Sequence, residues 1–164
     1  RPSQGEGGHL GPNPGLFNRY KFDKRLDIGV FQTNTFLEDL NISGVPILET
    51  SVKSDQTSFD ICLALSLVNE DEKTVNQFST GFLRIKNTKR NEYHKCKIAM
   101  HPTNISLLKG TKLRLSISAA AYPAIGVNSG FGDDKLGTPS VNHKVITLSC
   151  VLDKTFMKMT PFFN

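Results

Sequence analysis

The segment 107–132 (LLKGTKLRLSISAAAYPAIGVNSGFG) limits the possible fold more than any other part of the chain. After a Lys109-Gly110 turn, apolar and polar residues alternate strictly for eight positions. The apolar positions are Leu113, Leu115, Ile117 and Ala119, and the polar ones are Lys112, Arg114, Ser116 and Ser118. A period of two is that of a β-strand with one buried face and one face toward water. The segment ends in Tyr122-Pro123 and a Gly- and Asn-rich loop. It predicts a sandwich strand running into an irregular loop at a sheet edge.

Other segments show the same strand pattern. Phe59–Val68 is apolar on one face and only mildly polar on the other, which predicts a central strand covered on both sides. The remaining predicted strands are 27–33, 45–53, 74–77, 81–86, 96–101, 112–120 and 144–152. No amphipathic helix pattern is found. Short strands separated by Gly, Asn and charged turns indicate an all-β protein, and seven to nine of them suit a jelly-roll β-sandwich.

The length of 164 residues fits one domain with a real core. We divide it into a Gly- and Pro-rich arm (1–26), a β-sandwich domain (27–152) and a C-terminal tail (153–164). The arm is expected to be irregular, and the tail either packs on a neighbouring surface or is disordered. The first residue is Arg rather than Met, and residues 1–16 lack the apolar stretch of a signal peptide. We therefore expect a piece of a longer soluble protein, its compartment open but with the cytoplasm preferred.

The net charge is +5, and one group of basic residues is dense. It consists of Lys86, Lys89, Arg90, Lys95 and Lys97, with His94 among them. Such a group either binds an anionic partner or forms a solvated hairpin turn. We favour the hairpin turn, because no stacking platform or nucleic-acid motif accompanies the charges. No apolar run approaches the length of a membrane span. Neither a nucleic-acid partner nor a membrane partner is expected.

The sequence offers little catalytic chemistry. Cys62, Cys96 and Cys150 lie in apolar strands without a C-x-x-C spacing, so a disulfide framework or a zinc site is not expected, although one disulfide pair stays open. The chain has no nucleophile elbow, H-E-x-x-H, P-loop or dinucleotide motif, and we predict no metal and no cofactor. His101 and His143 are interpreted as structural or surface histidines.

Seven pieces of the chain resemble, in order, the C-terminal jelly-roll domain of the cocaine esterase-like and X-Pro dipeptidyl-peptidase serine hydrolases. The pieces are PSQGEGG (2–8), RLDIGVF (25–31), LEDLNISG (37–44), SDQTSF (54–59), GFLR (81–84), KG followed by RLSISAAAYP (109–123) and NSG (128–130). The sequence departs from the family's pattern at Ser58, Thr111, Lys112 and Ala124, and at 142–144, so we expect a divergent member.

The resemblance implies an all-β jelly-roll β-sandwich with a galactose-binding-domain-like fold. It also implies a function: a non-catalytic domain that packs on the α/β-hydrolase catalytic domain of the same parent chain and helps wall its substrate cleft. In such enzymes the Gly-rich arm passes near that cleft, so His9 and Leu10 are the predicted cleft-lining residues.

Two other functions were weighed. A stand-alone carbohydrate- or ligand-binding β-sandwich would need an exposed aromatic platform, and the chain has no Trp. An independent enzyme with a site of its own has no support in any motif. The sequence therefore favours an accessory domain without its own triad, whose parent is a hydrolase.

Overall fold

A computed structural model describes residues 16–131 and 143–161, and within these ranges the chain is built from antiparallel strands. The strands are β1 (Phe17–Asn18), β2 (Gly29–Gln32), β3 (Leu40–Gly44), β4 (Ile47–Ser54), β5 (Phe59–Val68), β6 (Val75–Ile85), β7 (His94–Ala99), β8 (Thr103–Leu107), β9 (Lys112–Ser118), β10 (Leu148–Cys150) and β11 (Phe156–Lys158). Two short 3-10 turns, η1 (Phe22–Lys24) and η2 (Leu152–Lys154), complete the described elements.

The larger sheet has five strands in the order β1-β6-β5-β9-β2. Its centre is β5, which pairs antiparallel with β6 on one side and β9 on the other. Nine of the ten residues of β5 are buried, which confirms the predicted central strand covered on both faces. The tight β5–β6 connection follows from the charged turn after Val68, where the Asp71 carboxylate accepts backbone hydrogen bonds from Lys73 and Thr74.

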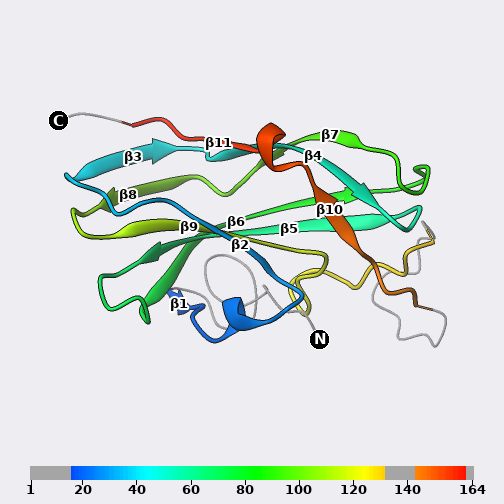
Figure 1. Ribbon diagram of the computed structural model, residues 1–164, viewed down its shortest axis with the longest axis horizontal. Helices are drawn as coiled ribbons and strands as arrows, with labels where there is room; N and C mark the ends of the chain where they lie inside the picture. Colours follow the sequence, from blue (N-terminus) through cyan, green and yellow to red (C-terminus); the bar gives the residue numbers. More distant parts are fainter. Residues whose placement is uncertain (1–15, 132–142, 162–164) are drawn as a thin grey trace.

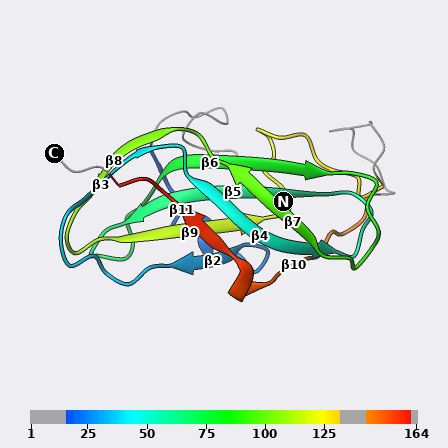
Figure 2. The same cartoon turned by 90° about the horizontal axis from the view of Figure 1, so that it is seen from above.

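The second layer is organised around β4. This strand pairs with β7 along one edge and with β10 and β11 along the other, while β3 and β8 form a separate two-stranded ladder. Figure 1 shows the two layers one above the other, with β3, β4 and β7 over β5, β6 and β9. The view from above shows that β4 and β7 cross diagonally over the strands of the five-stranded sheet (Figure 2). The protein is therefore the jelly-roll β-sandwich that the sequence predicted.

The core lies between the layers and comes from alternating inward positions of both. Leu48 and Val52 of β4 are fully buried against Phe59, Ile61 and other inward residues of the facing sheet. The inward residues of β9 belong to the same cluster, as their alternation predicted. Each such side chain contributes about 1.5–3 kcal/mol on leaving water, so this cluster provides most of the driving force for the fold.

The two long sides of the sandwich differ. On the β6–β7 side the layers touch through an antiparallel bridge between Gly81 and Met100. A Cβ placed on Gly81 would lie 2.9 Å from the Met100 Cγ atom, so this close approach requires glycine. On the other side, β2 and β10 are the last strands of their sheets, and no described strand pairs with their outer edges. The sandwich is thus closed on one side and open on the other.

Several predictions from the sequence were wrong in detail. The segments 74–77 and 81–86 are one strand, β6, and the predicted strand 144–152 contributes only β10. The strands β1, β3, β8 and β11 were not predicted, and β1 and η1 lie in the arm that was expected to be irregular. Residues 86–93 are not a hairpin turn, because β6 and β7 pair with different strands and the segment connects the two layers.

The polar face of β9 also differs from its predicted solvated state. Ser116 and Ser118 are buried, and Arg114 and Ser116 bind Asp23 from the segment that precedes β2. A period of two reports which residues share a face, but it does not report whether another segment covers the polar face. Here residues 16–28 cover part of it.

Candidate functional site

The open side of the sandwich holds a slot of about 860 Å³. One wall comes from β2 and the end of β9, and the other from β10 and the residues before it. The third boundary is the loop after β9. We name this feature the β2–β10 slot. Its lining residues are Leu26, Asp27, Gly29, Phe31, Ile117, Ser118, Ala119, Ala120, Tyr122, Val127, Asn128, His143, Lys144, Val145, Ile146, Thr147, Leu148, Cys150 and Leu152.

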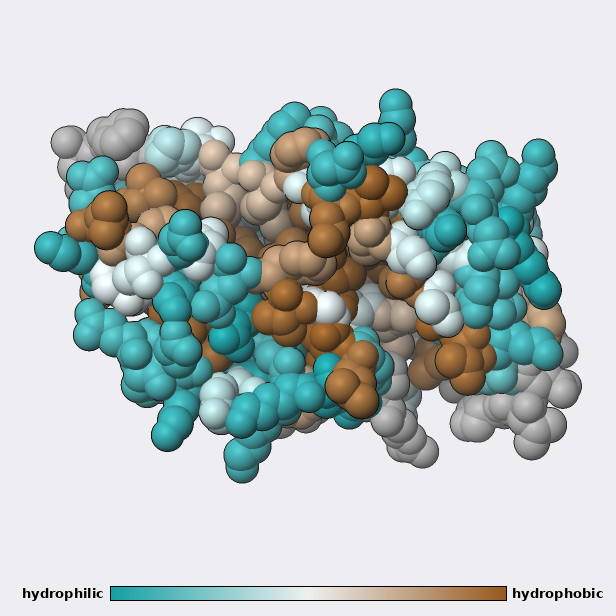
Figure 3. Space-filling view, in the orientation of Figure 1, coloured by the Kyte–Doolittle hydropathy of each residue, from teal (hydrophilic) through white to brown (hydrophobic). Residues whose placement is uncertain are grey.

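The lining is mainly apolar, and its rim exposes large side chains. Leu26 is fully exposed, Val145 is 85% exposed and Leu152 is 65% exposed. Figure 3 shows apolar side chains gathered in the middle of this face, over β2, β10 and η2. Deeper in the slot, Ile117 and Leu148 belong to the hydrophobic core or pack against it. The slot is suited to binding an apolar surface, since burying such a rim is favourable.

A buried ion pair fixes the loop that forms one boundary of the slot. Asp60 of β5 and Arg84 of β6 lie opposite each other, and the guanidinium binds both carboxylate oxygens at 2.7 and 2.6 Å. The second Asp60 partner is Asn128, whose side-chain amide donates to Oδ1 at 2.8 Å. Arg84 also donates to the Gly126 carbonyl at 2.7 Å. These contacts hold the loop against the five-stranded sheet, because Gly126 and Asn128 both bind the paired strands β5 and β6.

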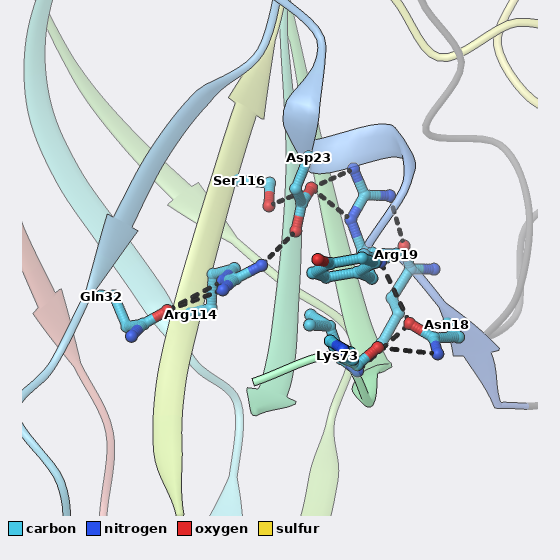
Figure 4. A network of polar contacts seen from close by, with 10 residues as sticks. Asn18, Arg19, Asp23, Gln32, Lys73, Arg114 and Ser116 are labelled. Carbon is cyan, nitrogen blue, oxygen red and sulfur yellow. Dashed lines mark hydrogen bonds and ion pairs between the residues drawn. The ribbon is translucent and has the colours of Figure 1, made fainter. Parts of the chain in front are cut away.

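A second polar network fixes the segment that leads into β2 (Figure 4). Arg19 is fully buried and lies 3.1 Å from the Asp23 carboxylate, and its Nη1 donates to Gln77 at 2.9 Å. Asp23 also accepts from Ser116 at 2.9 Å and from Arg114 at 3.3 Å. One carboxylate therefore joins the entering segment to β9. A buried charge is tolerated only when it is paired in this way.

Burial and ion pairing shift the pKa values of the charged groups in this segment in opposite directions. Burial lowers the pKa of the Arg19 guanidinium, and the nearby Asp23 carboxylate opposes that effect. At the slot rim, a hydrogen-bonded pair with Arg25 lowers the pKa of the Asp27 carboxyl. The Asp27 carboxylate is thus paired with Arg25, so this part of the slot rim carries an ion pair.

The wall formed by residues 143–148 is held by Asp55, at the end of β4. The Thr147 N–H donates to Asp55 Oδ1 at 2.9 Å, and the Asp55 N–H donates to the Thr147 carbonyl. Burial alone would raise the pKa of this carboxyl. Hydrogen bonds from Thr147, Gln56 and Ser54 outweigh it, and the net pKa lies below the ordinary value of 3.8.

This arrangement predicts a pH-dependent contribution to stability. A depressed pKa in the folded state means that Asp55 stabilises the fold above the unfolded-state pKa, near 4, and that the contribution is lost as pH falls through the folded value. We expect Asp55→Ala to lower the free energy of unfolding by about 1 kcal/mol at pH 7. Urea unfolding of both proteins from pH 7 to pH 3 should show this difference shrinking below about pH 4. A constant difference down to pH 3 would contradict the assignment.

All three cysteines are free, so the disulfide pair left open by the sequence is not formed. Cys62 and Cys96 are buried, and Cys150 is half-buried in the slot. Burial raises the pKa of each of these thiols, and a nearby Asp60 charge adds to the effect at Cys62. Because the thiolate is the nucleophile, none of them is activated.

We therefore expect slow reaction of these thiols with a colorimetric disulfide reagent at pH 7.5. Cys150 should react first, at least about tenfold more slowly than in the urea-unfolded chain, since one pKa unit changes the thiolate fraction about tenfold. Cys62 and Cys96 should react only on unfolding. Rapid labelling of Cys62 in the native protein would show that β5 is not covered as described.

The structure does not reach the two predicted cleft-lining residues, because His9 and Leu10 lie outside the described residues. His101 is held by Thr80, whose hydroxyl lies 2.9 Å from Nδ1, and the His94 ring packs near Phe59. His143 lines the slot. Among the described residues, no group of three or more His, Cys, Asp or Glu is placed to hold a metal ion. In the same part of the chain, no helix has the length and hydropathy needed to cross a membrane.

Sequence reasoning missed the slot itself. Leu26 lay in the arm that was expected to be irregular, and Val145 lay inside the predicted strand 144–152. Phe31 belonged to a predicted strand, but nothing in its pattern placed that strand at an open edge. The sequence carried no local signal for the slot, because the slot depends on which described strands stand at the ends of their sheets.

The fold and the slot together define an antiparallel β-sandwich with an apolar slot at one edge. The family model for the X-Pro dipeptidyl-peptidase C-terminal non-catalytic domain matches residues 9–150, and the chain belongs to this family. It is accordingly a non-catalytic C-terminal domain of the X-Pro dipeptidyl-peptidase type. Among curated protein sequences, none matches this one.

Solved structures with the same fold come from hydrolases. An aminopeptidase from a marine sediment archaeon of the Thaumarchaeota superposes with a TM-score of 0.82 at 12% identity, covering 90% of this chain and 28% of the aminopeptidase. A selenomethionine-labelled α-amino acid ester hydrolase gives 0.80 at 14% identity, covering 90% and 27%. A CocE/NonD family hydrolase from Staphylococcus aureus gives 0.59 at 14% identity, covering 90% and 36%. At these identities the likeness shows the fold, and this chain spans about a quarter to a third of each neighbour.

Proposed function

We propose that this chain is the accessory domain of a serine hydrolase of the X-Pro dipeptidyl-peptidase or acyl esterase class, that it packs on the α/β-hydrolase domain of its parent, and that it helps wall the substrate cleft. The match of the non-catalytic family model over residues 9–150 carries this proposal. The three neighbours support it, since each is a hydrolase or peptidase of which only 27–36% is covered by the match.

The domain itself is proposed to have no catalytic role. Its recognisable chemistry is structural: the carboxylates of Asp23 and Asp60 are used in ion pairs, and the thiols are buried. His9 and Leu10 are proposed to reach the cleft of the parent, because the arm that carries them precedes the sandwich. Replacing His9 with Ala in the parent enzyme should then change KM more than the unfolding temperature.

The first experiment tests for activity in this chain alone. Incubation with p-nitrophenyl acetate and with an Ala-Pro chromogenic amide should give no turnover above buffer. Turnover that disappears in Ser129→Ala or His143→Ala would overturn the accessory role and indicate an independent enzyme.

The second experiment uses the parent protein. The reading frame upstream of Arg1 should encode a G-x-S-x-G motif within a few hundred residues. In the purified parent, replacing that serine should abolish ester and peptide hydrolysis, while the present domain stays folded. A parent without such a motif, or one that keeps its activity after the serine is replaced, would contradict the proposed class.

The volume of the β2–β10 slot supports a second candidate, a carbohydrate- or ligand-binding module, because small-molecule pockets are of about this size. Clear saccharide binding on a glycan array, lost when Tyr122 is replaced with Ala at the slot, would favour this candidate.

A further inference from the structure

The fold divides the basic group of the sequence between two places. Its first members lie within residues 86–90, in the connection after β6, whereas Lys95 and Lys97 lie on β7. Cys96 and Ile98 of the same strand belong to the core, so the alternate residues Lys95 and Lys97 point outward. Figure 2 looks down on this outer face, where β7, β4 and β11 lie side by side.

Three more lysines reach the same face from other segments. Lys53 lies on β4, next to the core residue Val52 and therefore on the opposite face of the strand. Lys154 ends η2, and Lys158 ends β11. These lysines are far apart in the sequence, and the pairing of β7 and β11 with β4 brings them together.

The basic charge on this outer face is only partly compensated. Glu49 of β4 accepts a hydrogen bond from Lys158 Nζ at 2.9 Å and lies 4.0 Å from Lys97 Nζ. The hydrogen bond from Lys158 lowers the pKa of the Glu49 carboxyl, so this group is ionised at neutral pH. Lys95 and Lys154 have no carboxylate partner among the residues that the structure describes. The face therefore carries a net positive charge.

The lysines without an acidic partner border a shallow depression of about 270 Å³. Its floor is Ser51 of β4, which is the pairing partner of Lys95 on β7. The Ser51 carbonyl accepts a hydrogen bond from the residue before η2, which places η2 on the other side. Lys95 and Lys97 form one wall, and Lys154 forms the opposite one. Asp153, the neighbour of Lys154 in the sequence, does not line the depression.

The floor of the depression offers a further donor. Ser51 is 8% exposed, and its hydroxyl forms no hydrogen bond with the described residues. A buried hydroxyl group is more stable when it has a partner, so a bound acceptor would be favoured here. Phe156 lines the same depression and is 57% exposed, which adds an aromatic surface beside the donors.

We propose that this depression, which we name the Ser51 site, binds the phosphate group of a small phosphate monoester. Ammonium groups from two sides and a hydroxyl from the floor suit a compact oxyanion with several acceptor oxygens. A phosphate monoester has three such oxygens and a charge of about −1.5 to −2 at pH 7, and lysine binds phosphate as a point charge. The Phe156 ring can pack against an apolar group attached to the phosphate.

The Ser51 site is independent of the proposed accessory role. It shares no lining residue with the β2–β10 slot, and it lies on the outer face of the second layer rather than at the open edge. Its presence or absence in experiment would therefore leave the proposed function untouched.

The test follows the amide NMR signals of the full chain while inorganic phosphate or phenyl phosphate is added. Signals of residues 50–52, 95–97 and 154 should shift, and those of the slot should not. Phenyl phosphate should bind at least about threefold more tightly than phosphate because of the ring contact. Raising the salt from about 10 to about 150 mM shortens the Debye length from about 30 to about 8 Å and should weaken binding. Acetate that binds the same residues as tightly as phosphate would overturn the proposal.

Variants of the donors test the assignment. Lys95→Gln with Lys154→Gln should raise the dissociation constant for phenyl phosphate at least about tenfold, because two charge-assisted contacts are lost. Ser51→Ala should raise it about tenfold, since a hydrogen bond to a charged group is lost. The matched control, Lys21→Gln with Lys109→Gln, removes the same net charge from exposed positions outside this face and should leave binding nearly unchanged. Equal effects of the two double variants would overturn the site.

Glu49→Gln gives a readout that loss of folding cannot imitate. It removes the carboxylate that lines the depression and releases Lys97 and Lys158, so phenyl phosphate should bind about threefold to fivefold more tightly. Phe156→Ala should remove the advantage of phenyl phosphate over inorganic phosphate without weakening the binding of phosphate itself. Unchanged or weaker binding in Glu49→Gln would contradict the proposal.

A lipid headgroup can also carry a phosphate monoester, and vesicle flotation separates the two sources. Vesicles of phosphatidylcholine with phosphatidic acid should not carry the chain upward in the gradient. If the chain floats, Lys95→Gln with Lys154→Gln abolishes flotation and phenyl phosphate does not bind, the ligand is a membrane lipid. In that case the assignment to a small soluble compound is wrong.

Discussion

Replacing Asp60 with Ala is expected to destabilise the domain by about 3 kcal/mol, because the half-buried Arg84 guanidinium loses both hydrogen bonds to the carboxylate and keeps its contact to the Gly126 carbonyl, while the Asn128 amide loses its acceptor. Asp60 is 1% exposed, and it accepts three hydrogen bonds, two from Arg84 and one from Asn128. Urea unfolding followed by circular dichroism measures the change. Because the loop near Asn128 also loses its anchor, amide hydrogen exchange there should become faster than in the strands.

The matched control is Asp27→Ala. Asp27 forms the same two-bond contact with an arginine, Arg25, at 2.9 and 2.7 Å, but the side chains are 44% and 34% exposed. An exposed pair contributes about 0–1 kcal/mol. Comparable losses of unfolding free energy in Asp27→Ala and Asp60→Ala would mean that burial does not determine how strongly the Asp60–Arg84 pair stabilises the domain.

Replacing Phe59 with Ala should have an effect of similar size, about 3–5 kcal/mol, through loss of packing. Phe59 is fully buried at the start of β5, belongs to the core cluster and contacts the His94 ring. Thermal unfolding should show the midpoint falling by roughly 6–20 °C, since about 1 kcal/mol corresponds to about 2–4 °C in domains of 150–250 residues.

Phe156→Ala removes the same group from an exposed strand. Phe156 is 57% exposed on β11, and its replacement should cost less than about 1 kcal/mol. Equal losses from both changes would place the stabilising core elsewhere than between β4 and β5. A larger loss from Phe156 would assign the C-terminal strand a greater role than its burial suggests.

The sequence predicted the central part of the fold well. The alternation in Phe59–Val68 and in 112–120 reproduces β5 and β9 almost to the residue, because both strands bury one complete face in the core. Turn chemistry added the boundaries: Gly110 adopts a φ of +86°, which favours glycine.

The peripheral strands could not be predicted in the same way. The strands β3 and β8 are five residues long with two apolar residues each, Leu40 and Ile42 in one and Ile105 and Leu107 in the other, and they form by pairing with each other. Phe17–Asn18 is a strand only because β6 offers it an edge. Such strands depend on tertiary contacts between residues far apart in sequence, which local patterns do not record.

For the candidate site, too, the sequence predicted some features and missed others. The family and the accessory role could be inferred from short motifs in order, and the family model confirms that inference. The polar networks could not be predicted, since the partners of Arg19 and Asp60 come from strands distant in the sequence. The slot arises where β2 and β10 have no further strand neighbour among the described residues, which is a property of topology rather than of composition.

The Asp23 network has a consequence for how the domain is tethered. The segment before β2 is fixed at two places, because β1 pairs with β6 and Asp23 binds both Arg114 and Ser116 on β9, so a linker from the proposed catalytic domain would end at β1. Each residue that is fixed rather than flexible shortens the span of such a linker by up to about 3.5 Å. A shorter linker raises the effective concentration of one domain beside the other. Docking on the proposed catalytic domain would then need less contact energy than two free proteins require.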